Sequence, residues 1–314
     1  MEEKTNIIFI MSTSHSGSTL LDLILGSHSQ ILSGGEINHT WDSGLMKNYP
    51  APLTHADISH PALINLNRTC SCGLPGVSCS YWQEVLKNLR KPGKSRQAHA
   101  LEAATRAMLD AAGRNFLCDS SKNTEWLEQY LLNDHFRPQI IHLLRDPRAV
   151  GYSFKRKGEF LKKKAGINNQ REMDAYLIHT LRRNKNTYEY PHAVFNWMRG
   201  NLKRMRKFSE IGNYQMVLYE NLVCHPVETI KTILFKLGLA YEPSMAEYQC
   251  QTHHILEGNR IRLDKKPVQF NPSYVEELSF REWWAGTCIA FPLLLKLGYP
   301  LPRSKIRDHF AKPG

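Results

Sequence analysis

The residues near the N-terminus best suited to chemistry form a Ser/Gly-rich turn, Ser14-His-Ser-Gly-Ser-Thr19. The apolar run Asn6–Met11 before it predicts a buried strand, and the run Leu20–Leu25 after it predicts a helix. This order directs the free N–H groups of a helix N-terminus at one place, which suits an anion the size of a phosphate. The turn differs from a Walker A loop because Ser18, not lysine, follows Gly17. A capped helix without a ligand is the alternative interpretation.

A second anion-binding pattern follows the apolar run Gln139–Leu144, which predicts another strand. Arg145 comes directly after this run, Asp146 is a good helix N-cap, and Pro147 suits the first helical position. Ser153 lies eight residues beyond Arg145, about two helical turns along. Ligands of parallel sheets collect at the carboxyl ends of strands, so we expect this arginine beside the first turn. An arginine fork and a serine hydroxyl would bind a second phosphate, and a surface arginine paired with Asp146 is the alternative.

Short apolar runs that predict strands alternate with longer runs that predict helices. This alternation predicts an α/β fold with a mostly parallel central sheet and helices on both faces. We expect a single domain over residues 1–314, in which Thr40–Gln97, a Cys-containing stretch with little periodicity, forms an insertion at the sheet edge. The predicted strands are Asn6–Met11, Asn115–Cys118, Gln139–Leu144 and Gln215–Leu218, and the predicted helices include Ala98–Ala112, His192–Ser209 and Val227–Leu237.

The charge balance indicates a polyanionic partner. The chain has 41 Lys and Arg residues against 29 Asp and Glu residues, a net charge of +12, which suits nucleic acid or a small phosphorylated molecule. Six of the ten residues Lys155–Lys164 are basic, which predicts an exposed helix end or a lid. The acidic start Met1-Glu-Glu argues against a secretory signal, and no apolar run reaches the ~18 residues of a membrane span. We therefore expect a cytoplasmic protein.

Three of the seven cysteines lie close together, as Cys70-Ser-Cys72 and Cys79. The odd number, spread over apparently folded segments, argues against a disulfide framework. Three thiols with a nearby histidine would suit structural zinc, but Cys-x-Cys is not the usual knuckle spacing. We therefore favour a buried or redox-sensitive thiol cluster and expect no metal site.

The two anion-binding patterns resemble those of sulfotransferases that use 3′-phosphoadenosine 5′-phosphosulfate (PAPS), in the bacterial-type branch related to tyrosylprotein and carbohydrate sulfotransferases. Ser14–Leu21 is similar to the 5′-phosphosulfate loop of that family, and Leu143–Ser153 is similar to its 3′-phosphate motif. Val217–Val223 looks like its strand with a Tyr-Glu pair, and His254–Arg262 looks like its loop that closes over the nucleotide. The resemblance implies a P-loop-like fold over nearly the whole chain.

The resemblance also implies roles for single residues. The first turn would hold the 5′-phosphosulfate, Arg145 and Ser153 would bind the 3′-phosphate, and Tyr219 would lie near the adenine or ribose. The complete cofactor-binding set implied is Ser14, His15, Ser16, Gly17, Ser18, Thr19, Arg145, Ser153, Lys157, Tyr219, Asn259, Arg260 and Arg262.

Three residues are candidates for the transfer step itself. Glu36 follows two glycines where tyrosylprotein-type relatives have a catalytic glutamate, and it would accept the proton of the acceptor hydroxyl. His15 stands where relatives have lysine or arginine, and histidine, with an ordinary pKa of about 6.5, is not permanently cationic. Lys122, after another predicted strand, would supply the missing charge. His15, His28 and His39 are alternative bases.

We therefore expect an enzyme that moves a sulfuryl group from PAPS to a hydroxyl of a glycan, a lipid or a small metabolite, without a metal. The acceptor pocket is expected in Thr40–Gln97 and Lys162–Tyr190. One alternative is a P-loop phosphotransferase or kinase, which Ser18 in place of the Walker lysine disfavours. Another is a basic nucleic-acid-binding protein, for which the sequence has no recognition motif. We expect no nucleic acid partner, and contact with a membrane surface stays open.

Overall fold

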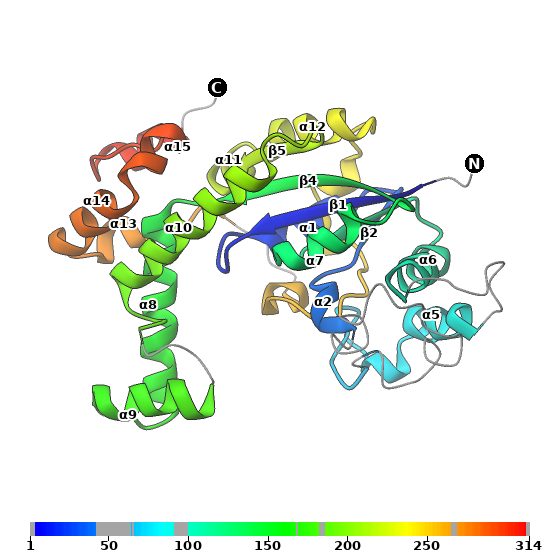
Figure 1. Ribbon diagram of the computed structural model, residues 1–314, viewed down its shortest axis with the longest axis horizontal. Helices are drawn as coiled ribbons and strands as arrows, with labels where there is room; N and C mark the ends of the chain where they lie inside the picture. The colour runs from blue at the N-terminus through cyan, green and yellow to red at the C-terminus, as the bar shows by residue number, and fades with distance from the viewer. Residues whose placement is uncertain are drawn as a thin grey trace.

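A five-stranded sheet lies at the centre of the computed structural model, which describes residues 4–41, 64, 66–90, 100–167, 169–181, 186–264 and 269–311. Its strands have the order β2-β3-β1-β4-β5, and every pairing between neighbours is parallel. All five carboxyl ends therefore lie at one edge of the sheet (Figure 1). The strands are β1 (Thr5–Ser12), β2 (Ile31–Ser33), β3 (Phe116–Asp119), β4 (Phe136–Leu144) and β5 (Tyr214–Leu218).

The apolar residues of β1 explain why this strand is central. Ile7, Phe9 and Met11 pack into one hydrophobic cluster, whereas Ile8 and Ile10 pack into another. A strand that is apolar on both faces has to be covered on both faces. The first face is covered by α5 (Ser80–Arg90), α6 (Ala100–Ala112) and α7 (Thr124–Leu131), and the second by α1 (Ser18–Leu25), α11 (Tyr219–Cys224) and α12 (Pro226–Leu237).

A third cluster joins the C-terminal helices to α8 (Pro147–Lys164) and α10 (Tyr190–Phe208), on one side of the sheet in Figure 1. At its centre, the fully buried Arg148 pairs with Asp146 at 2.8 Å and lies over the Trp283 ring. The Asp146 side chain also accepts the Arg148 N–H and caps α8, as predicted. The C-terminal helices are α13 (Ser273–Glu277), α14 (Phe280–Lys296) and α15 (Lys305–Ala311).

The remaining elements are short. Among them, α2 (Ile37–Thr40) follows β2, and α9 (Gln170–Ala175) lies at the far end of α8 (Figure 1). Among the described residues, no helix is both long enough and apolar enough to cross a membrane. The others are η2 (Gly76–Ser78), the π-helix η3 (Tyr176–Thr180), η4 (Pro243–Met245), η5 (Tyr248–Cys250) and η6 (Arg260–Leu263).

The predicted α/β fold with a parallel, P-loop-like sheet is confirmed. The predicted strands and helices are present with small shifts of their ends, and Lys155–Lys164 forms the end of α8. The sequence missed β2, because three residues, Ile31–Ser33, carry too little pattern to indicate a strand. Of the expected insertion Thr40–Gln97, residues 42–63, 65 and 91–97 are outside the described part, and α5 packs against α6 in the hydrophobic cluster on one face of the sheet. The assignment of residues 1–314 to one domain stays a prediction.

Candidate functional site

A cavity of about 800 Å³ lies at the carboxyl edge of the sheet. Loops that follow all five strands contribute to its lining, because a parallel sheet brings all of those loops to one edge. Most of the site residues predicted from the sequence meet here. Those that line the cavity are Ser14, His15, Gly17, Ser18, Thr19, Glu36, Lys122, Arg145, Lys157, Tyr219 and Asn259.

The turn between β1 and α1 has a backbone shape that favours anion binding. His15 and Gly17 both have left-handed backbone angles, with φ of 67° and 90°, and such residues alternating with right-handed ones turn N–H groups toward one point. Gly17 is the N-cap of α1, so the first N–H groups of that helix open into the same space. A Cβ on Gly17 would lie 2.3 Å from a Tyr219 ring carbon, so the turn requires glycine here.

Arg145 joins the turn to the end of β4. Its Nη1 donates a hydrogen bond of 2.8 Å to the His15 carbonyl, and its guanidinium lies 4.5 Å from the centre of the Tyr219 ring. The buried Arg145 Nε has no hydrogen-bond partner among the described residues. A buried donor without a partner is costly, so this nitrogen is available to an anion in the cavity.

Glu36 and Lys122 form an ion pair in the cavity wall. The side chains are 19% and 17% exposed, and His39 Nε2 lies 3.8 Å from the other Glu36 carboxylate oxygen. Lys122 has a φ of 65°, an uncommon backbone conformation for a residue with a side chain. The Asn38 N–H donates to Ser121 Oγ at 3.0 Å, so the two loops that carry this ion pair are also joined directly.

Two buried carboxyl groups hold these loops in place. Asp22 on α1 accepts the Gly35 N–H at 3.0 Å and the Ser120 hydroxyl at 3.3 Å, and burial raises its pKa to about 7. Asp119 accepts the Ser121 N–H at 2.8 Å, and burial raises its pKa to about 6. The role of Asp22 was not predicted from the sequence, because a single aspartate in an apolar helix does not reveal what it contacts.

Arg204 is a lining residue that the sequence analysis missed, and Gly258 lines the cavity from within the predicted loop His254–Arg262. Arg204 on α10 reaches the cavity, and burial lowers its pKa. Its Nε and Nη1 are buried and lack hydrogen-bond partners within the part of the chain that the structure describes. Gly258 has a φ of 135°, and a Cβ there would lie 3.8 Å from Thr19 Oγ1 and 3.9 Å from Glu36 Oε1. Gly258 therefore lies between Thr19 of the anion-binding turn and the Glu36 carboxylate.

Four predicted cofactor-binding residues are not in the cavity lining. Ser16 is buried beneath the turn, where its hydroxyl lies 2.8 Å from Thr13 Oγ1. The Ser153 hydroxyl donates to the Ala149 carbonyl within α8 at 2.9 Å. The remaining two are Arg260, which is exposed, and Arg262, which donates to the Thr69 carbonyl at 3.0 Å. Their roles in binding stay predictions.

The histidines proposed as alternative bases are not equally placed. His15 and His39 line the cavity. His28 does not line it, and its Nε2 lies 2.9 Å from the Ala240 carbonyl. Of the three, only His15 and His39 therefore lie where an acceptor in the cavity can meet them.

Comparison with known proteins agrees with this geometry. The model of the Sulfotransferase family matches residues 7–243, a range that contains the anion-binding turn, Glu36, Lys122 and Arg145. The sulfotransferase domain from the curacin biosynthetic pathway has 19% identity and a TM-score of 0.55, covering 96% of this chain and 100% of that domain. The sulfotransferase domain of the Synechococcus PCC 7002 olefin synthase has 19% identity and a TM-score of 0.54, covering 96% and 98%. No curated protein matches the chain significantly. Because the family match spans most of the sequence and the solved structures share the fold, the chain belongs to the sulfotransferase family.

Proposed function

We propose that the protein transfers a sulfuryl group from PAPS to a hydroxyl acceptor, with Glu36 as the general base. One observation carries the proposal: Arg145 is bonded to the carbonyl of the anion-binding turn, and both face a cavity that also holds the Glu36–Lys122 pair. Two anion sites side by side suit a donor with charged groups at both its 5′ and 3′ positions. A carboxylate in the same cavity suits a reaction that removes a proton.

The donor would be held mainly by positive charge and backbone N–H groups. In this proposal the turn Ser14–Thr19 and the N-terminus of α1 hold the 5′-phosphosulfate. Arg145 binds the 3′-phosphate through its free Nε, and Arg204, with unpaired buried nitrogens, is a second candidate for it. Tyr219 supports both the turn and the arginine, because its ring lies against Gly17 and under the guanidinium.

In the transfer step the acceptor oxygen attacks sulfur in line with the bond that breaks. The bond between sulfur and the bridging oxygen of the 5′-phosphate breaks, and its electron pair leaves with that oxygen on adenosine 3′,5′-bisphosphate. The acceptor proton passes to the Glu36 carboxylate. Lys122 and the N–H groups of the turn stabilise the negative charge that develops on the bridging oxygen. Lys122 would thus supply the permanent positive charge that His15, which stands where relatives have lysine or arginine, does not supply.

Calorimetry with three ligands tests the proposed donor: adenosine 3′,5′-bisphosphate, ATP and a duplex oligonucleotide. We expect tight binding of the bisphosphate only, and a loss of at least about tenfold in its affinity in Arg145→Ala. Arg137→Ala is the matched control, because Arg137 is exposed near the other end of the same strand. A preference for ATP would refute the proposal in favour of phosphoryl transfer.

The acceptor is proposed on the basis of the sequence alone. We propose a glycan, a lipid or a small metabolite, met by the enzyme in the cytoplasm. The cavity lining includes no described residue of Thr40–Gln97 or of Lys162–Tyr190, so the acceptor pocket expected in these two segments stays a prediction. Incubation of sulfur-labelled PAPS with an extract of the source organism identifies the labelled product directly.

A further inference from the structure

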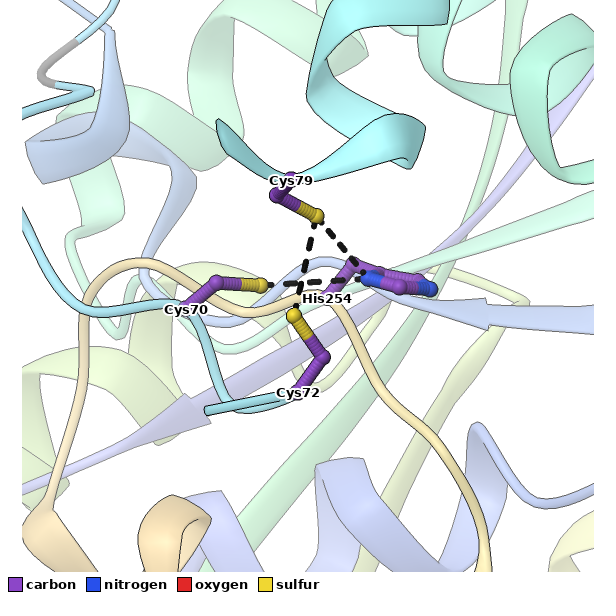
Figure 2. A group of neighbouring side chains, drawn as sticks. All are labelled: Cys70, Cys72, Cys79 and His254. Atoms are coloured by element: carbon purple, nitrogen blue, oxygen red, sulfur yellow. Dashed lines mark hydrogen bonds between the residues drawn. The ribbon is translucent and has the colours of Figure 1, made fainter. Parts of the chain in front are cut away.

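Three cysteines and a histidine meet at one point outside the transfer cavity. Figure 2 shows the thiols of Cys70, Cys72 and Cys79 and the imidazole of His254 pointing toward one another. Their Sγ and Nδ1 atoms all lie within 4.8 Å of one another. Cys70 and Cys79 are fully buried, and the other two side chains are partly buried. His254 comes from a segment 175 residues beyond Cys79, so folding alone brings the fourth group to the thiols.

The spacing of the four atoms fits a tetrahedral metal ion. With bonds of about 2.3 Å to sulfur and 2.0 Å to nitrogen, a tetrahedral zinc ion separates its ligand atoms by about 3.5 to 3.8 Å. Cys72 Sγ lies 3.7 Å from Cys79 Sγ, and Cys70 Sγ lies 3.8 Å from His254 Nδ1. The Cys79 Sγ to His254 Nδ1 distance, 3.2 Å, is somewhat shorter. Small side-chain movements are enough to place all four around one ion.

We propose that Cys70, Cys72, Cys79 and His254 bind a structural Zn²⁺ ion. Three thiolates and one imidazole are a donor set typical of structural zinc, and four protein ligands leave no open position for substrate. The ion is therefore assigned to stability and not to sulfuryl transfer. The Cys-x-Cys spacing argued against zinc in the sequence analysis. The fourth ligand, His254, comes from a distant segment, so the spacing of the cysteines could not indicate it.

The chemistry of these four groups agrees with a metal-binding role, because thiols bind a metal ion as thiolates and imidazole binds it through a nitrogen lone pair. Zinc would displace three thiol protons and leave one net negative charge on the complex. The Nδ1 atom of His254 lies on the side of the ring that faces the thiols of Cys70 and Cys79. Its ring stacks on Tyr81, with ring centres 4.9 Å apart, which fixes its orientation.

The site joins the described part of the insertion to the segment that borders the transfer cavity. The Ser71 N–H donates to the Ile255 carbonyl at 3.0 Å, and the Ile255 N–H donates to Ser71 Oγ at 2.9 Å. Trp82 Nε1 donates to the His254 carbonyl at 3.0 Å. Gly258, four residues beyond His254, borders Thr19 and Glu36. Zinc would thus fasten a cavity-lining segment to the insertion, and its loss would loosen that segment.

Metal analysis of the full-length protein tests the proposal directly. We expect about one zinc ion per chain after purification without chelator, and near-complete loss of zinc in Cys72→Ser and His254→Ala. Cys288→Ser is the matched control, because Cys288 is an exposed free cysteine away from the cluster, and it should retain the metal. Circular dichroism of each variant separates loss of the metal from loss of the fold.

Cobalt substitution and thiol analysis test the proposal without an assay of sulfuryl transfer. Replacement of zinc by Co²⁺ should give thiolate-to-cobalt charge-transfer bands and a tetrahedral visible spectrum, both absent in Cys72→Ser. Wild-type protein that stays metal-free after reconstitution with excess zinc would overturn the proposal. A disulfide between Cys72 and Cys79 in protein kept under reducing conditions would overturn it as well, as would full zinc retention in both ligand variants. None of these measurements depends on the identity of the sulfuryl donor or acceptor.

Discussion

At the scale of single residues, the site combines a paired carboxylate with several cations that an anion can reach. The ion pair between Glu36 and Lys122 places a carboxylate and a cation side by side in the cavity wall. Arg145 is held by the His15 carbonyl and by Tyr219, so binding of a phosphate to its Nε requires little rearrangement. The cations Lys122, Arg145 and Arg204 therefore all come from segments distant in sequence from His15.

Lys122→Ala should lower the transfer rate more than the affinity for the donor. The lysine is assigned to charge that develops only as the bridging oxygen leaves, so the expected loss is about a hundredfold in kcat. Turnover of sulfur-labelled PAPS at saturating concentration measures the rate, and calorimetry with adenosine 3′,5′-bisphosphate measures affinity. Lys164→Ala, at the exposed end of α8, is the control. An unchanged rate at saturating donor would remove Lys122 from the mechanism.

Arg204→Ala should weaken binding of adenosine 3′,5′-bisphosphate by about tenfold, which is the usual worth of a charge-assisted hydrogen bond. The physical reason is that its buried Nε and Nη1 have no partners among the described residues and line the same cavity as Arg145. Arg199→Ala is the matched control, because Arg199 is an exposed arginine on the same helix, α10. Equal affinities in the two variants would assign Arg204 to packing alone.

At the scale of elements, the buried Asp22 connects the helix of the anion-binding turn to two loops of the site. It accepts hydrogen bonds from Gly35, beside Glu36, and from Ser120, close to Lys122. One side chain of α1 therefore holds the segments after β2 and β3 in register. This explains how a carboxylate and a cation from two separate loops come together.

Asp22→Asn should change how stability depends on pH. Burial raises the pKa of Asp22 from 3.8 to about 7, so between these values the folded protein holds a proton that the unfolded chain has lost. Stability from this group is thus present at low pH and is lost as pH rises toward 7. Asparagine keeps an acceptor oxygen but does not titrate. Between pH 3.8 and about 7, the free energy of unfolding of the variant minus that of the wild type should therefore rise by up to about 1.4 kcal/mol per pH unit.

Urea unfolding at pH 5 and pH 7 measures this difference. Glu220, whose pKa burial raises to about 7, is present in both proteins and cancels in the comparison. The charge of Asp119 adds to the raised pKa of Asp22, so this repulsion is part of the difference that Asp22→Asn removes. Asp110→Asn, an exposed aspartate near the end of α6, is the control. A constant difference between variant and wild type at both pH values would show that Asp22 is ionised in the folded protein.

At the scale of the whole molecule, the parallel sheet turns separate sequence motifs into one site. Its strand order places β1 between β3 and β4, so the loop that carries Lys122 and the loop that carries Arg145 flank the anion-binding turn. The net charge of +12 adds a long-range attraction for an anionic donor. The zinc proposal belongs to this scale as well, because Cys79 and the fourth ligand, His254, are 175 residues apart in the sequence.

The sequence by itself determined the features that local pattern controls. The apolar runs identified four of the five strands, and Asp146-Pro147 located the start of α8. Two motifs, Ser14–Leu21 and Leu143–Ser153, resemble those of sulfotransferases, and this resemblance indicated the family. Strand β2 was not predicted, because it is only three residues long.

Only the tertiary structure decided which side chains meet. The pairing of Lys122 with Glu36, the entry of Arg204 into the cavity and the hydrogen bonds of Asp22 join residues from different elements. His254 belonged by sequence to a loop expected over the nucleotide, yet it lies at the cysteine cluster. The physical reason is the same in each case: side-chain contacts depend on how elements pack, and packing distances are not encoded in the spacing of residues along the chain.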